Sequence, residues 1–108
     1  MKKYEVVKEK RIFDKIIKES KFVKNETFVI YYEEHSENFP KFGVAVGKKI
    51  GNAVTRNKYK RIIRNLIDSN KFLFKNTYDY IIIIKKSCLN KSYNELNDSL
   101  NQLIKEKL

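Results

Sequence analysis

One stretch decides the fold of this chain: KKIGNAVTRNKYKRIIR, which runs from Lys48 to Arg64. Gly51 and Asn52 predict a turn, because both residue types tolerate positive φ angles. Thr55 can cap a helix there, because its hydroxyl can accept a hydrogen bond from a free backbone N–H. The predicted helix reaches about Ser69, and its apolar side chains recur every three or four positions, at Tyr59, Ile62, Ile63, Leu66 and Ile67.

The other side of this predicted helix is cationic. At about 100° per residue, the polar side chains opposite the apolar stripe are Arg56, Asn57, Lys60, Arg61 and Arg64. No Asp or Glu stands between Glu37 and Asp68, whereas a solvated helix face normally mixes the two signs. Uncompensated charge favours a polyanion partner, and arginine can hold a phosphate with two hydrogen bonds. A solvated face and an anionic membrane surface are the alternatives.

The composition agrees with nucleic-acid binding. The chain has 108 residues, with 24 Lys and Arg against 13 Asp and Glu, and a net charge of +11. This length predicts one domain over residues 1–108, and this charge predicts an affinity that falls steeply with salt. Seven Tyr and seven Phe exclude a disordered basic tail. No run approaches the roughly 18 apolar residues of a membrane span, and no secretory signal follows Met1, so no membrane partner is expected.

The chain offers little material for chemistry of its own. Cys88 is the only cysteine and His35 the only histidine, which leaves almost nothing for a zinc site or a Cys–His pair. A lone thiol favours a reducing compartment. We expect Cys88 to be a half-buried apolar residue and His35 to be exposed in a loop. No two acids have a spacing that favours acid–base catalysis or metal binding, so no catalytic residue and no metal ligand is expected in the protein.

The remaining pattern predicts an α+β sandwich in the order helix–strand–strand–strand–helix–strand–helix. Helices are expected over residues 7–20, over the basic segment, and from the capping box that opens at Ser92. Strands are expected at 22–23, 27–33, 42–47 and 79–85, and the last two should be parallel because a helix connects them. The isoleucines at 81–84 indicate a central strand covered on both faces.

Two aromatic residues are candidates for binding unpaired bases, because stacking on aromatic rings tolerates any sequence. Phe13 lies in the first predicted helix, and core packing is an equal alternative for it. Tyr31 lies in the strand 27–33, on the face opposite Phe28, Ile30 and Tyr32. Since those three side chains already supply an apolar face for the core, the pattern favours a binding role for Tyr31.

From Gly43-Val44-Ala45-Val46 through Lys48–Val54 to Arg56-Asn57, Lys60-Arg61 and Arg64, the chain closely resembles the signature of the bacterial ribonuclease P protein subunit. The order of the other elements agrees over most of the chain. The resemblance implies an endoribonuclease holoenzyme in the cytoplasm that removes the 5′ leader of precursor tRNA. Its RNA subunit is the catalyst and uses Mg²⁺, and the protein is an RNA-binding cofactor. A mixed four-stranded sheet with a left-handed βαβ crossover is also implied, against the right-handed default.

The resemblance further assigns roles to single residues. The positions that match the contacts to the catalytic RNA are Lys48, Lys49, Arg56, Asn57, Lys58, Lys60, Arg61 and Arg64. The positions that match the cleft for the single-stranded leader are Phe13, Ile17, Val29 and Tyr31. The family often has an aromatic residue where this chain has Ile17, which implies weaker stacking on one leader base.

The implied partners are the ribonuclease P RNA subunit and precursor tRNA, and DNA is not expected. A basic α+β ribosomal protein is one rival interpretation. A DNA-reading helix is another, but a strand precedes the basic helix where a helix and a short turn would be needed. No set of residues in the sequence supports the third rival, a ribonuclease made of protein alone.

Overall fold

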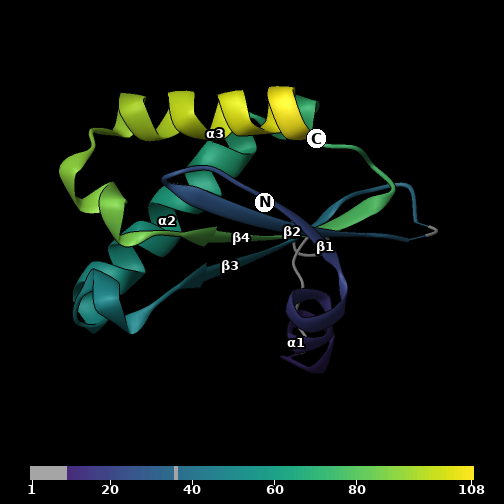
Figure 1. The fold of residues 1–108 in the computed structure, drawn as a ribbon, viewed down its shortest axis with the longest axis horizontal. Coiled ribbons are helices and arrows are strands. Elements are labelled where there is room, and N and C mark those ends of the chain that lie inside the picture. Colours follow the sequence, from purple (N-terminus) through teal and green to yellow (C-terminus); the bar gives the residue numbers. More distant parts are fainter. Residues whose placement is uncertain (1–9, 36) are drawn as a thin grey trace.

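A mixed four-stranded sheet with helices on both faces forms the fold (Figure 1). This computed structural model describes residues 10–35 and 37–108, with side chains from Asp14 onward. The strands are β1 (Lys21–Lys24), β2 (Phe28–Glu34), β3 (Lys41–Val46) and β4 (Tyr78–Ile84), in the spatial order β1-β2-β4-β3. The helices are α1 (Lys10–Glu19), α2 (Ala53–Ser69) and α3 (Tyr93–Lys107), with short 3-10 helices η2 (Lys48–Ile50), η3 (Lys71–Leu73) and η4 (Lys86–Asn90). The predicted α+β class and mixed sheet are confirmed.

The central strand β4 organises the sheet. It pairs antiparallel with β2 and parallel with β3, as a helical connection between β3 and β4 requires. Both Ile81 and Ile82 are fully buried although they point to opposite faces, which confirms that this strand is covered on both sides. The left-handed sense of the β3–α2–β4 crossover stays a prediction from the family resemblance.

The two faces of the sheet have different covers. Helices α2 and α3 enclose the main core with side chains such as Phe28, Ile30 and Ile82. Helix α1 lies on the opposite side and contacts β2 and β4 (Figure 1). Its Ile16 is fully buried. Within the described residues, α1 leaves Tyr31 and Ile83 of this face only half-buried.

The start of the basic helix differs from the prediction. The capping residue is Asn52, whose Oδ1 accepts a hydrogen bond from the Thr55 backbone N–H at 3.0 Å, so the proposal that Thr55 is the cap was wrong. Asparagine is a slightly stronger cap than threonine, and Gly51 with φ of 154° sets the turn that places it. The capping box at Ser92 and Glu95 is present as predicted.

His35 and Cys88 are both more enclosed than expected. The side chain of His35 is only 13% exposed, and its Nε2 lies 3.4 Å from Oδ1 of Asp79. Its backbone N–H donates to Thr77, which extends the sheet edge and draws the residue inward. Cys88 is fully buried in the main core, and burial raises the pKa of its thiol. A neutral, inaccessible thiol of this kind is a packing residue.

Candidate nucleic-acid interface

Helix α2 carries a row of cations beside its apolar face. Tyr59, Ile63, Leu66 and Ile67 are buried in the core. We call the four neighbouring cations the cationic stripe; they are Arg56 and Lys60, which are half-buried, and Arg61 and Arg64, which are exposed. Within the described residues, none of the four has an ion-pair partner. The stripe is therefore a concentrated positive charge that the described part of the chain does not neutralise.

The segment before α2 adds more positive charge. Lys48 and Lys49 are exposed in η2, and Asn57 is exposed in the first turns of α2. The N-terminus of a helix has a partial positive charge of its own, which adds to that of the lysines. A side chain at Gly51 would place its Cβ 3.0 Å from Cβ of Thr55, so only glycine fits this turn without displacement. The turn thus holds η2 and α2 together as one cationic unit.

Lys58 borders the cationic stripe on the side of Arg61. At about 100° per residue, it lies about 160° around α2 from Arg56 and Lys60 but only about 60° from Arg61. Its side chain is exposed, and its Nζ lies 6.0 Å from the centre of the Tyr59 ring. Lys58 therefore stays a predicted contact to the catalytic RNA, as its match to the RNA-binding positions of the family implies.

Part of the sheet face beneath α1 is left uncovered by the described residues. The pairing register places Val29, Ile83 and Ala45 side by side across β2, β4 and β3, and Tyr31 lies on the same face. All four are half-buried, and we call them the open face. In Figure 1, α1 and the η2–α2 junction both extend below the sheet, and η2 follows β3, the strand that carries Ala45 of the open face. An extended chain lying on it would therefore end beside the cations.

The structure brings together most of the residues expected to bind the leader. Val29 and Tyr31 belong to the open face, and Ile17 is half-buried in α1, which borders it. Phe13 lies in α1, but its side chain is outside the described residues. Sequence reasoning missed Ile83 and Ala45, because only the strand register shows that they adjoin Val29. It also missed Phe22, whose ring lies 5.4 Å from that of Tyr31.

Charge is distributed unevenly along this side of the sheet. Glu33 and Asp79 are paired across β2 and β4 at one end of the face, whereas Lys24 is paired with Val29 toward the other end. Burial raises the pKa of Asp79, and His35 and Lys41 oppose that rise by stabilising the carboxylate. A polyanion is thus favoured at the end that is closer to Lys24 and η2.

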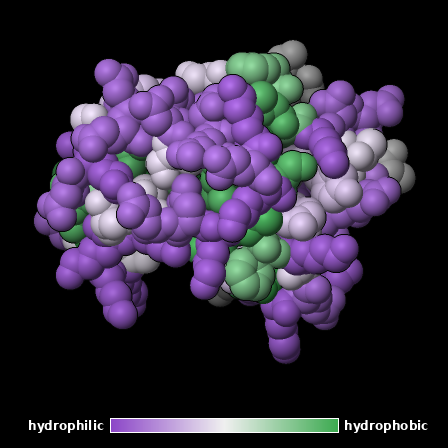
Figure 2. Space-filling model, turned by 45° about the horizontal axis from the view of Figure 1, so that its top comes forward, coloured by the Kyte–Doolittle hydropathy of each residue, from purple (hydrophilic) through white to green (hydrophobic). Residues whose placement is uncertain are grey.

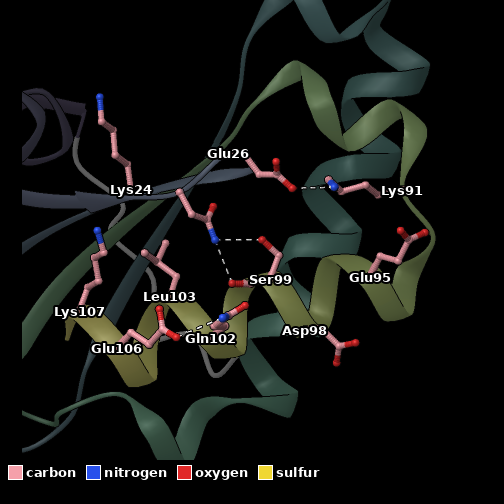
Figure 3. A pocket seen from close by; sticks show the side chains of 11 residues that line it. Lys24, Glu26, Lys91, Glu95, Asp98, Ser99, Gln102, Leu103, Glu106 and Lys107 are labelled. Atoms are coloured by element: carbon pink, nitrogen blue, oxygen red, sulfur yellow. Dashed lines mark hydrogen bonds and ion pairs between the residues drawn. The ribbon is translucent and has the colours of Figure 1, made fainter.

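A groove on the other side of the molecule has the wrong charge for RNA. It has a volume of about 530 Å³ and lies between β1 and α3 (Figure 3). Its charged lining consists of Glu26, Glu95, Asp98 and Glu106 together with Lys24, Lys91 and Lys107. Lys91 is paired with Glu26 at 3.0 Å, and the excess of acids repels phosphate. Figure 2 shows that hydrophilic residues dominate the face in view, with hydrophobic ones gathered mainly in a central band and in small spots toward one edge.

The described part of the chain contains neither a metal-binding cluster nor a membrane-spanning helix. Residues 10–35 and 37–108 contain no group of three His, Cys, Asp or Glu side chains that could hold a metal ion. None of the helices within these ranges is long and apolar enough to cross a membrane.

Known proteins resemble this chain over nearly its whole length. Residues 1–107 match the family described as Ribonuclease P. The ribonuclease P protein component of Mycoplasma mycoides subsp. mycoides is 44% identical over 107 residues, which is 98% of each chain. That of Mesoplasma florum is 40% identical over 96% of each chain.

Solved structures share the fold as well. A Staphylococcus aureus RNase P protein mutant superposes with a TM-score of 0.86 at 31% identity, covering 95% of this chain and 87% of that one. The RNase P protein from Thermotoga maritima superposes with a TM-score of 0.84 at 28% identity, covering 96% and 99%.

Proposed function

Because this chain belongs to the ribonuclease P family as a protein component, we propose that it binds a catalytic RNA subunit and the 5′ leader of precursor tRNA. The protein acts as the cofactor of an endonuclease that produces the mature 5′ end of tRNA. We expect it to work in the bacterial cytoplasm, where its RNA partners are made.

The observation that carries this proposal is the connection between the two surfaces: η2 and the cationic stripe follow directly after β3, which supplies Ala45 of the open face. Two kinds of RNA contact need two kinds of surface. Arginines such as Arg61 and Arg64 can each fork onto phosphate oxygens of a folded RNA. The open face offers Tyr31 and aliphatic side chains, which suit unpaired bases and not a duplex.

The two surfaces suggest how the protein aids cleavage. The stripe, Lys48 and Lys49 dock on the RNA subunit, while the open face holds the single-stranded leader a short distance away. Holding both fixes the bond to be cut relative to the RNA. Mg²⁺ supplies the metal chemistry in the RNA subunit, and protein cations that neutralise nearby phosphates reduce the Mg²⁺ concentration needed to fold and dock the complex.

Reconstitution tests the cofactor role. The purified protein is added to a cognate ribonuclease P RNA, and precursor tRNA cleavage is followed over a series of Mg²⁺ concentrations. We expect the protein to accelerate cleavage most strongly at low Mg²⁺. Identical rates with and without protein at every Mg²⁺ concentration would refute the proposal.

Binding measurements test the leader contact separately. In the reconstituted enzyme, Tyr31→Ala should weaken the binding of precursor tRNA more than that of mature tRNA, because only the precursor carries the leader. Equal losses for both RNAs would remove the leader from the role of the open face.

A further inference from the structure

We propose that Phe22 extends the open face to the β1 edge of the sheet and stacks on a leader base distant from the cleavage site. The inference rests on the proposed function, because it adds a specificity-determining residue to the same surface. It gives this chain a binding position on β1, the outermost strand.

The position of Phe22 is the first support. It is directly opposite Tyr31 in the antiparallel register of β1 and β2, so both rings stand on the same face. Their centroids are 5.4 Å apart and their planes are tilted by 42°. The Phe22 side chain is nevertheless 51% exposed. The two rings thus form a connected aromatic surface, half of which stays in water.

Core packing does not account for Phe22. The neighbouring Val23 points to the other face, where it packs against the main core. β1 is therefore anchored by Val23, and Phe22 lies outside the core cluster. A large apolar side chain on an edge strand also invites unwanted pairing with other chains. A ligand that covers Phe22 during function explains why the exposed ring is present.

The charge next to Phe22 suits RNA. Lys24 follows two residues later, on the same face of β1, and it is exposed. Lys24 also borders the groove between β1 and α3, but Figure 3 shows its side chain extending away from α3 and the carboxylates there. A base stacked on Phe22 could therefore have its phosphate near an available ammonium group.

The sheet width predicts which part of the leader is involved. β1 and β3 are the two edges of the sheet, and η2 follows β3. Three strand spacings of about 4.8 Å separate them, or about 14 Å. If the RNA subunit docks on η2 and α2, Phe22 lies a few nucleotides farther from the cleavage site than a base near η2. Short leaders would not reach Phe22.

Leader length therefore provides the test. Affinities of the reconstituted holoenzyme are measured for precursor tRNAs whose leaders lengthen by one nucleotide at a time. Phe22→Ala should weaken the binding of long-leader precursors by about five- to hundredfold, the range for loss of one stacked base. Short-leader precursors and mature tRNA should bind as they do to the unaltered holoenzyme. Phe72→Ala is the matched control, because Phe72 is an exposed phenylalanine in η3, away from this face.

Two additional variants separate stacking from folding and from the proposed function. Phe22→Tyr should retain binding, and Phe22→Leu, which keeps an apolar side chain on β1, should lose it. If Tyr31→Ala impairs long-leader binding while Phe22→Ala and Phe22→Leu do not, the inference is overturned and the proposed function stands. If Tyr31→Ala has no leader-dependent effect either, the leader role of the whole face is overturned. A Phe22→Ala loss of equal size at every leader length also contradicts the inference.

Discussion

Removing two cations of the stripe on α2 should lower the salt dependence of RNA binding by a predictable amount. Each cation that neutralises a phosphate contributes about 0.9 to the slope of log K against log salt for a duplex, and about 0.7 for a single strand. The double substitution of Lys60→Ala and Arg64→Ala should therefore reduce the slope by about 1.4 to 1.8. Both residues lack an ion pair within the described part of the chain.

The same structure predicts a small effect on stability. Neither side chain is fully buried, and their neighbours on the stripe are also positive. The free energy of unfolding should change by less than about 0.5 kcal/mol, as for ordinary surface substitutions. A loss of RNA affinity could then be attributed to the interface and not to unfolding.

Filter binding to the ribonuclease P RNA over a range of monovalent salt concentrations, at constant Mg²⁺, measures the slope. Lys105→Ala is the control, because Lys105 is an exposed lysine of α3 that matches no predicted RNA contact, and the variant loses the same charge per residue. An unchanged slope for the double variant would refute the docking role of the stripe. A reduction by Lys105→Ala as large as the loss per cation in the double variant would show that only net charge matters.

Three further predictions concern the scaffold that holds this interface. Gly51→Ala should lower the free energy of unfolding by about 1–3 kcal/mol, since φ is 154° and the new Cβ meets Cβ of Thr55 at 3.0 Å. Urea unfolding measures this loss, and an unchanged unfolding midpoint contradicts the prediction. Asn70→Ala should cost a similar amount, because this buried amide joins α2 to α3 through two side-chain hydrogen bonds, with Asn97 and Asn101, and donates a third to the Leu66 carbonyl of α2. The exposed Asn65→Ala should cost little. Hydrogen bonding to Ser92 lowers the pKa of Glu95, so its ionised form stabilises the fold at neutral pH. The stability difference between the unaltered protein and Glu95→Gln should therefore shrink as the pH falls through that lowered pKa, and a difference that stays constant into acid would exclude the charge as its source.

Local patterns were sufficient for much of the fold. The alternation of Phe28, Ile30 and Tyr32 with Val29 and Tyr31 identified β2 and its two faces, because side chains of a strand alternate strictly. The capping box located the start of α3, because its two partners, Ser92 and Glu95, are only three residues apart.

Other features could not be read in this way. Asn52 and Thr55 are both acceptable caps, and the conformation of Gly51 selected between them. His35 resembled a loop residue because its partners Thr77 and Asp79 are far away in the sequence. Phe22 had no assigned role beyond a short predicted strand, because its pairing with Tyr31 follows only from the register of β1 and β2.

The sequence by itself determined that this chain has a cationic helix next to a strand, and the residues of that helix sufficed to suggest the family. Those properties depend on neighbours within a few residues, where spacing and charge can be read directly. Only the tertiary structure decided that Ile83 and Ala45 adjoin Val29 and that Phe22 reaches the same surface. These depend on how strands distant in the chain are paired, and pairing is set by burial of the whole sheet between α1 and the helices α2 and α3.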